Sequence, residues 1–197
     1  ATAVATQALA VSKIPTKEWF IERVGADGAV VSTAQELKDA IDSGKKTICI
    51  YGKIDYFADE GFSLKNNQKL VGTEYFTGYT GQEKFSQISF SGSMERAIEA
   101  VSGNVTIADI SLSYDSSSTT AANLLYLNGS NSVLRNLDIN FSADAAQIGS
   151  AQGAICVYGG NLQIEGVNNI NGSGYFGGSV FLLGTKAVLA EDAELNI

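Results

Sequence analysis

The chain has 197 residues, of which 45% are hydrophobic and 17% are charged, so it is long enough for one folded domain with a substantial core. Its 13 basic and 21 acidic residues give a formal charge of −8, which argues against binding to nucleic acid or anionic lipid surfaces. There is no histidine, which excludes Ser-His-Asp and Cys-His catalysis and histidine-ligated zinc sites. No apolar run reaches the length of a membrane helix. We therefore expect no metal, no cofactor and no membrane insertion.

Residues 1–31 carry weak signals and are predicted to form an N-terminal segment or linker. The small residues at the start lack a positively charged region, which fits either the mature end left by signal-peptide cleavage or an artificial boundary. The apolar stretch 19–24 is predicted to pack on the main body, and a turn follows at 25–28. Because Ile197 lies inside a strand pattern, we expect the chain to be the N-terminal part of a longer protein.

One amphipathic helix is predicted over residues 32–43. Ser32 or Thr33 can serve as its N-cap, with Glu36 at the spacing of a capping box, and Gly44 is suited to end it. Its apolar face consists of Ala34, Leu37, Ala40 and Ile41. A helix directly before a series of strands is expected to cover the open apolar end of a repeat array.

Strands are predicted at 47–52, 53–57, 62–65, 68–72 and 86–90, whereas the Gly-, Thr- and Tyr-rich stretch 73–84 predicts a long excursion from the core. Residues 97–101 are interpreted as a strand with a local irregularity. Alignment on the turn glycines places Glu99 where later repeats have Leu125, Ile155 and Val180. An inward Glu99 would be costly unless it were paired.

From residue 97 onward the sequence repeats one plan: an apolar strand, a glycine-centred turn and a second strand. The turn glycines are Gly103, Gly129, Gly159 and Gly184. A period of about 25 to 30 residues is typical of solenoids, in which parallel strands stack about 4.8 Å apart. Asparagines near the turns are expected to stack between coils and bond the turn backbone. These asparagines are Asn104, Asn131, Asn136 and Asn161.

Both cysteines, Cys49 and Cys156, lie inside apolar strand patterns. We interpret them as buried free thiols, because cysteine is among the most buried residue types. A disulfide between them would require the two residues to lie within bonding distance, which the sequence does not determine.

The order of helix, strand, turn and strand resembles the right-handed parallel β-helix of the pectin-lyase-like superfamily. Segment 32–54 is similar to the capping helix and first strand of that group, and 68–72, 104–112 and 132–139 are similar to its repeats. The resemblance covers residues 32–197 and implies an all-β fold: a right-handed parallel β-helix solenoid with an N-terminal amphipathic capping helix.

Enzymes of that superfamily cleave polysaccharides, but their Trp-Ile-Asp-His type of motif is absent. An arginine base flanked by calcium-binding aspartates is hard to place among Arg23, Arg96 and Arg135, since Arg135 lies in a strand of the repeat with no acidic cluster beside it in sequence. The aspartates that might meet across coils are Asp109, Asp115, Asp138 and Asp144, and solvated or turn carboxylates are the favoured interpretation of each. Noncatalytic members of the fold form the passengers of bacterial autotransporters and related surface adhesins. The acidic, Ser-, Thr-, Asn- and Gly-rich composition is most similar to that group.

Aromatic residues in or beside irregular stretches are the candidate binding residues. They are Tyr56, Phe57, Tyr75, Phe76 and Tyr79. Aromatic rings can stack on sugars or insert into a protein partner. The alternative is that they fold over the side of the rod as apolar cover, and this alternative is the favoured one.

The sequence therefore favours a noncatalytic adhesin segment at a bacterial cell surface or outside the cell. It would be a monomer whose loops at 73–84, 113–122 and 140–152 bind a host or bacterial surface protein or a carbohydrate. Two alternatives remain open: a pectate-lyase-like polysaccharide-degrading enzyme, and a phage or secreted structural rod that assembles as a trimer.

Overall fold

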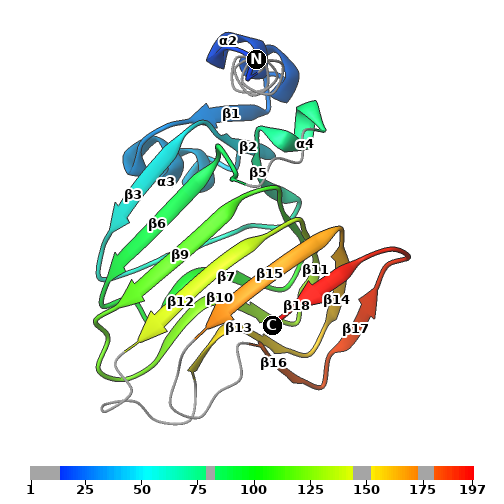
Figure 1. The fold of residues 1–197 in the computed structure, drawn as a ribbon. Coiled ribbons are helices and arrows are strands. Elements are labelled where there is room, and N and C mark those ends of the chain that lie inside the picture. Colours follow the sequence, from blue (N-terminus) through cyan, green and yellow to red (C-terminus); the bar gives the residue numbers. More distant parts are fainter. Residues whose placement is uncertain (1–13, 79–82, 144–151, 173–179) are drawn as a thin grey trace, which may run out of the picture.

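The structure, a computed structural model, describes residues 14–78, 83–143, 152–172 and 180–197. Within these ranges the strands form three parallel sheets of seven, six and five strands, here called sheets A, B and C. The chain passes from a strand of sheet A to one of sheet B, then to one of sheet C, and then returns to sheet A. One such coil is β8 (Asn104–Ala108), β9 (Ser111–Ser116) and β10 (Ala122–Asn128). The predicted parallel β-helix is thus confirmed as a parallel β-solenoid (Figure 1).

The strand bounds follow the predicted repeat closely. Sheet A contains β1 (Gly28–Val31), β2 (Thr47–Ile50), β5 (Gln68–Gly72), β8, β11 (Asn131–Arg135), β14 (Asn161–Glu165) and β17 (Lys186–Leu189). Sheet B contains β3 (Lys53–Phe57), β6 (Gln87–Gly92), β9, β12 (Asp138–Ala143), β15 (Val167–Gly172) and β18 (Glu194–Asn196). Sheet C contains β4 (Phe62–Ser63), β7 (Arg96–Val101), β10, β13 (Gln152–Tyr158) and β16 (Val180–Leu183).

The interior is built from columns of like residues, because side chains alternate between the two faces of each strand. On sheet B the strands are paired so that aliphatic residues lie over one another and are at most 6% exposed. This column is Ile54, Ile88, Leu112, Ile139 and Ile170. A second column is an aromatic stack, with ring centroids 5.4 to 6.4 Å apart. It consists of Tyr56, Phe90, Tyr114 and Phe141. Each coil therefore buries the apolar residues of its neighbours.

Two of the three corners of each coil contain residues in the left-handed region. The four predicted turn glycines all have positive φ and lie between sheets C and A, as expected. Their φ values are 77° for Gly103, 66° for Gly129, 63° for Gly159 and 64° for Gly184. The corner between sheets A and B contains one residue in the left-handed region in each of four successive coils. These residues are Asp109, Asn136, Gly166 and Asp192.

The predicted asparagine stacking between coils is confirmed. The Asn131 amide donates to the Asn104 side-chain oxygen at 3.1 Å, and the Asn161 amide donates to Asn131 at 2.6 Å. At the other corner, the Asn136 amide donates to Asp109 at 2.9 Å, and its oxygen accepts from the backbone N–H of Val167. The amides thus satisfy one another and the turn backbone along the solenoid axis.

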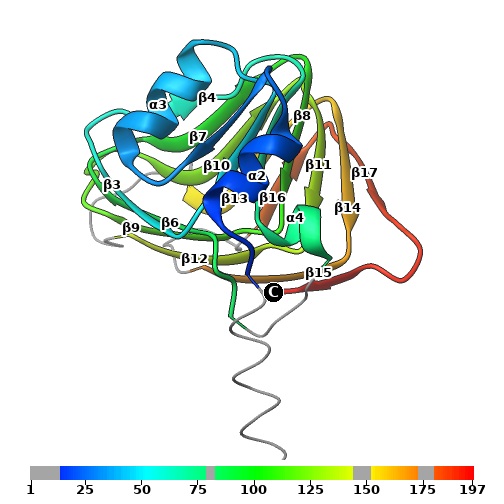
Figure 2. The same cartoon turned by 90° about the horizontal axis from the view of Figure 1, so that it is seen from above.

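Three helices lie near the N-terminal end in the described part of the chain (Figure 2). They are α2 (Lys17–Val24), α3 (Ala34–Asp42) and α4 (Glu74–Thr77). Helix α3 occupies the position of the predicted helix, and its Thr33 cap accepts from the Glu36 N–H at 3.1 Å. Its apolar face joins the main core and contacts β1, β2, β3 and β4. Both α2 and β1 lie within the segment 1–31, and β1 pairs in parallel with β2.

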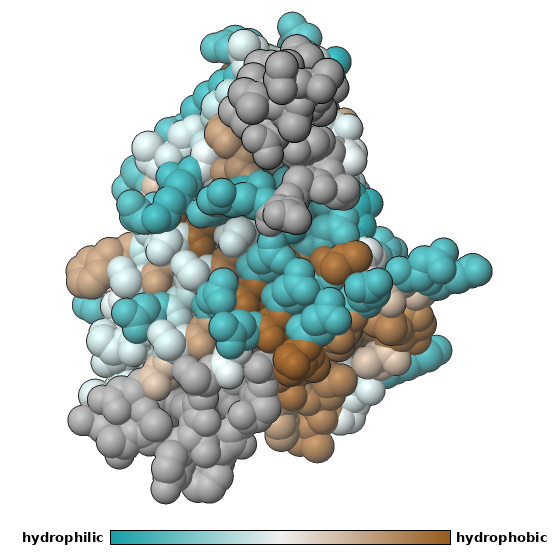
Figure 3. Space-filling model, viewed as in Figure 1, coloured by the Kyte–Doolittle hydropathy of each residue, from teal (hydrophilic) through white to brown (hydrophobic). Residues whose placement is uncertain are grey.

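The opposite end of the solenoid is apolar and open. The last strands of the three sheets, β16, β17 and β18, are edge strands, and large hydrophobic side chains are exposed on and around them (Figure 3). These side chains are Phe181, Leu182, Leu183, Val188, Leu189 and Ile197.

The predicted alignment of Glu99 was wrong by one residue. Ile98, not Glu99, is the residue that aligns with Leu125, and Glu99 aligns with Tyr126 on the outer face. The reason is that Ser102, with φ 59°, takes the turn position that Gly129 holds in the next coil, so alignment on Gly103 shifts the register. Glu99 is half-exposed and forms an ion pair with Arg96 at 3.0 Å, and residues Arg96–Val101 form the continuous strand β7.

The turn between sheets C and A allows a test of how closely the coils approach. Gly129 and Gly160 have nearly equal φ values, 66° and 67°, so alanine at either position should cost about 1–2 kcal/mol in backbone strain. A Cβ at Gly129 would meet nothing within 4 Å, whereas one at Gly160 would lie 2.1 Å from the Ser130 carbonyl oxygen. We expect Gly160→Ala to lower the urea unfolding midpoint clearly more than Gly129→Ala. Equal losses would contradict this explanation, because they would show that the close approach of Gly160 to the Ser130 carbonyl oxygen does not affect stability.

Candidate functional site

The structure does not bring the sequence-predicted aromatic residues together in one site. Tyr56 is only 6% exposed and belongs to the interior aromatic stack, whereas its neighbour Phe57 is 80% exposed on the outer face of sheet B. Tyr75 and Phe76 lie on α4 and are half-buried. Tyr79 lies outside the described residues.

Tyr75 and Phe76 pack against a second apolar cluster on the outer face of sheet A. A column of small apolar residues on that face is covered by α2 and α4, and the Phe20 and Phe76 rings meet with centroids 6.0 Å apart. The column consists of Val30, Cys49, Val71 and Ala108. The position of these two aromatic residues therefore fits the interpretation as apolar cover.

The aspartates that were considered as a cation site take separate partners. Asp109 is 2% exposed and pairs with Arg135 at 2.7 Å, and Asp138 pairs with Lys84 at 2.9 Å. Asp115 accepts from the Ser142 hydroxyl, and Asp144 lies outside the described residues. Among the described residues, no group of three or more His, Cys, Asp or Glu side chains is placed to hold a metal ion.

A buried carboxyl group, Glu74 of α4, lies near these pairs and was not singled out from the sequence. It is 6% exposed, and burial raises its pKa to about 7. Lys84 lowers this pKa, whereas the charges of Asp109 and Asp138 raise it. The corner that follows β5 therefore holds three carboxyl groups and two cations, namely Glu74, Asp109, Asp138, Lys84 and Arg135. With a pKa of about 7, Glu74 takes up a proton near neutral pH.

Both cysteines are buried free thiols, as predicted. Burial raises the pKa of Cys49 to about 12 and that of Cys156 to about 11. The Cys156 thiol donates to the Asn123 side-chain oxygen at 2.8 Å. Because the thiolate is the reactive form, neither residue is suited to be a nucleophile at neutral pH.

An aromatic strip runs across the outer face of sheet C and is the first candidate binding surface. It consists of Arg96, Tyr126, Tyr158 and Phe181, one residue from each of β7, β10, β13 and β16. The Tyr158 ring lies 5.5 Å from that of Tyr126 and 5.6 Å from that of Phe181, measured between centroids. The Arg96 guanidinium lies 3.5 Å from the centre of the Tyr126 ring. The strip thus presents three adjacent rings and one cation.

The strip depends on strand register, which is why sequence reasoning missed it. Tyr126 and Phe181 align with the small residue Cys156 between them, which is itself buried. Tyr158, two residues further along β13, contacts the rings on both sides. A signal was present, since each of these three strands carries one aromatic residue, but only the pairing shows that the rings meet.

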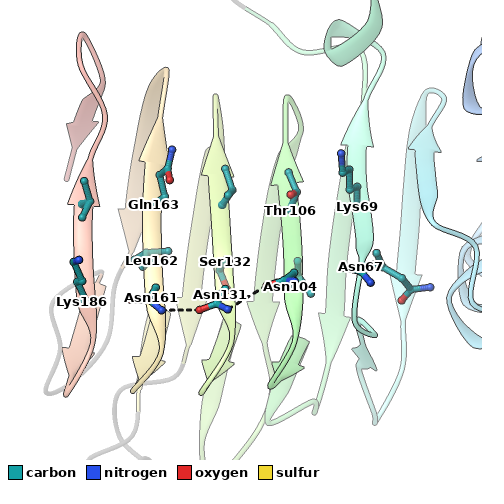
Figure 4. A pocket seen from close by; sticks show the side chains of 14 residues that line it. Asn67, Lys69, Asn104, Thr106, Asn131, Ser132, Asn161, Leu162, Gln163 and Lys186 are labelled. Atoms are coloured by element: carbon teal, nitrogen blue, oxygen red, sulfur yellow. Dashed lines mark hydrogen bonds between the residues drawn. The ribbon is translucent and has the colours of Figure 1, made fainter.

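A groove of about 630 Å³ on the outer face of sheet A is the second candidate surface, here called the amide groove (Figure 4). Two columns of side chains line it. The first is Asn67, Asn104, Asn131, Asn161 and Lys186, and the second is Lys69, Thr106, Val133, Gln163 and Val188. Its lining contains two lysines and no carboxylate, in a chain with a formal charge of −8.

None of the helices in the described part of the chain is long and apolar enough to cross a membrane. No family model, curated protein or solved structure matches the chain. The two outer-face surfaces and the buried corner are therefore the features from which a function has to be inferred.

The buried Glu74 predicts a pH-dependent stability. Its pKa is raised from 4.5 to about 7 in the folded chain, so the folded state binds the proton more tightly and stability falls as pH rises through this interval. Glu74→Gln removes the charge, and we expect it to stabilise the chain by on the order of 2 kcal/mol at pH 8 and by almost nothing at pH 4. Urea unfolding at several pH values measures this difference.

The control is Glu191→Gln, which changes an exposed carboxyl group in the turn before β18. This variant should follow the wild-type pH profile throughout. A Glu74→Gln variant whose stability stays parallel to that of the wild type from pH 4 to 8 would contradict the interpretation.

Proposed function

We propose that the chain is a segment of a noncatalytic adhesin, displayed at a bacterial cell surface or outside the cell, that binds carbohydrate through the aromatic strip on sheet C. The observation that carries the proposal is the contact of three outward-facing rings in a row across β10, β13 and β16. The apolar faces of sugar rings pack against aromatic rings, whose π-faces are electron-rich.

Two properties of the strip favour a sugar chain as its ligand. The rings are held by neighbouring coils of a stiff scaffold, so little conformational entropy is lost when a ligand binds. Tyr126 and Tyr158 are half-buried while Phe181 is 43% exposed, so the strip offers flat ring faces together with phenolic hydroxyls. Arg96 pairs with Glu99 through one N–H, and its other N–H groups can donate hydrogen bonds to sugar hydroxyls.

The proposal also includes a right-handed coil and a passenger-like role in an autotransporter-type protein. Both are what the resemblance to the pectin-lyase-like superfamily implies. Within that scheme, α3 serves as the cap of the solenoid, because Leu37, Ala40 and Ile41 lie on the core at its N-terminal end. The segment would act as a monomer. Of the loop predicted at 113–122, residues 113–116 belong to β9 and Ala122 begins β10, so the connection at 117–121 leads into the first strand that carries a ring of the strip.

Binding to the strip can be tested with immobilised neutral oligosaccharides and the variants Tyr158→Ala and Phe181→Ala. Each ring should contribute about 0.5–1.5 kcal/mol, so each change should weaken binding about two- to tenfold. Tyr158→Ala is expected to have the larger effect, because its ring contacts both neighbours. Surface plasmon resonance measures the dissociation constants.

The control for these variants is Ile21→Ala. This change shortens an exposed apolar side chain on α2, which precedes the first coil and carries no residue of the strip. It should leave the dissociation constant unchanged. Loss of binding in Phe57→Ala, with the strip variants unaffected, would instead support the candidate residues chosen from sequence.

The alternative of a polysaccharide-degrading enzyme has one observation in its favour, the corner in which Glu74 lies near Asp109 and Asp138 and Asp109 pairs with Arg135. A carboxyl group with a pKa of about 7 is suited to general acid catalysis. The adhesin proposal predicts no release of reducing or unsaturated ends from polygalacturonate and related glycans. Depolymerisation that is lost in Arg135→Ala or with a chelator would overturn it.

A further inference from the structure

Lys84 and Asp138 form an ion pair that differs from the other pairs in the described part of the chain. The Lys84 Nζ atom lies 2.9 Å from Oδ2 of Asp138, and the lysine side chain is only 9% exposed. In the three other pairs that contain a lysine, its side chain is 32 to 60% exposed, and the remaining two pairs contain arginine. This pair therefore brings a buried lysine into contact with a carboxyl group.

The pair joins two segments that are far apart in the sequence. Lys84 and Asp138 are separated by 54 residues. Lys84 lies at the end of the excursion, just before β6, whereas Asp138 begins β12, and β9 lies between these two strands in sheet B (Figure 1). A covalent bond between the two side chains would therefore tie three successive coils together.

The buried ammonium group of Lys84 is incompletely hydrogen-bonded. It has three N–H donors, and its one hydrogen bond to the described residues is the bond to Asp138. Burying a charged group is costly unless the group is paired and fully hydrogen-bonded. An amide bond between the two side chains would remove both charges, so burial favours this neutral product over the ion pair.

The other oxygen of Asp138 is bonded by a fixed amide donor. The Asn169 amide donates to Oδ1 of Asp138 at 3.0 Å, and the Asn169 side-chain oxygen accepts from the Asn196 amide at 3.0 Å. An N–H donor in this position stabilises the negative charge that develops on a carboxyl oxygen when a nucleophile attacks the carbon. The carboxyl group of Asp138 thus has an amine at one oxygen and a stabilising donor at the other.

Glu74, in the same corner, competes little for the lysine near neutral pH. Burial raises its pKa to about 7, so much of this carboxyl group is protonated there. A protonated carboxyl group carries no charge that would attract the ammonium. Asp138 is therefore the carboxylate that holds Lys84.

We propose that Lys84 and Asp138 form an intramolecular isopeptide bond, which makes this pair a site of covalent self-modification. The Lys84 ammonium transfers a proton to Oδ2 of Asp138, and the neutral amine nitrogen then attacks the carboxyl carbon while the Asn169 amide bonds Oδ1. A second proton passes from the nitrogen to Oδ2, and the bond between the carbon and Oδ2 breaks to release water. One ammonium and one carboxylate thus give one secondary amide and one water, without a further reactant.

The contact between the two groups in the fold drives this reaction. Reacting groups that are held in good geometry have effective concentrations of up to about 10⁵–10⁸ M, which opposes hydrolysis of the amide by water. The bond closes a long loop and restricts the unfolded chain, as a disulfide would. It depends neither on the aromatic strip nor on a binding function.

The intact mass of the purified whole chain, followed over time at neutral pH, tests the proposal. The wild-type chain should become lighter than its sequence by one water molecule. Trypsin cleaves after lysine and arginine, so it should then release residues 70–96 joined to residues 136–186. A mass equal to that of the sequence would show an ion pair only and would overturn the proposal, as would a water loss located in any other peptide.

Lys84→Arg keeps the positive charge but removes the amine, so this variant should retain the full mass of its sequence. It should also unfold at a lower urea concentration than the linked wild type, because its unfolded chain lacks the closed loop. The matched control is Lys53→Arg in an exposed lysine–aspartate pair, which should lose the water and keep the wild-type midpoint. Water loss in Lys84→Arg, or a midpoint equal to that of the linked wild type, would contradict the proposed bond.

Asn169→Asp tests the amide donor. The new carboxylate still accepts from Asn196 but cannot donate to Asp138, so the water should be lost more slowly, by on the order of a hundredfold. An unchanged rate would overturn the role of the Asn169 amide. Glu74→Gln keeps a neutral side chain and should lose the water as the wild type does, so its stability profile reports the buried carboxyl group alone.

Discussion

The parallel, in-register stacking of the coils is the constraint on which the rest of the structure depends. Interior columns such as Ile54, Ile88 and Leu112 exist only because each strand lies directly over the equivalent strand of the previous coil. A slip of one residue would turn every inward side chain outward, since side chains alternate with a period of two. The corners at Asp109, Asn136 and Gly166 maintain this register, because each residue takes the same left-handed conformation.

The same stacking also produces the candidate binding surfaces. An outward residue that recurs at one position of the repeat becomes a continuous column, whether of amides on sheet A or of rings on sheet C. Such columns are rigid where the backbone beneath them is hydrogen-bonded on both sides, as in β10 and β13 of sheet C and β11 and β14 of sheet A. Binding sites in a solenoid can therefore lie on the faces of its sheets, not only on the loops that leave it, where the sequence had suggested them.

The excursion after β5 shows what happens where the repeat is interrupted. Its first residues form α4, whose aromatic side chains cover the outer apolar column of sheet A. Its return brings Lys84 to Asp138, and Glu74 is buried between charged neighbours. Because three carboxyl groups there face two cations, the proton that Glu74 takes up near neutral pH balances the charge of the corner. Where the repeat is interrupted, the regular stacking of coils is thus replaced by a helix and by a cluster of charged side chains whose charges balance.

Much of the fold could be predicted from the sequence by itself. The period of the glycines, the alternation within strands and the N-cap at Thr33 determined the solenoid, the helix at Ala34–Asp42 and the asparagine ladders, because each is a local pattern repeated along the chain. The candidate surfaces could not be predicted in this way. Tyr126, Tyr158 and Phe181 are far apart in sequence, and an alignment on Gly103 that is wrong by one residue moves Glu99 to the wrong face. Only the tertiary structure decided which outward residues meet, because strand pairing sets the neighbours of each side chain and the repeat does not specify that register to the residue.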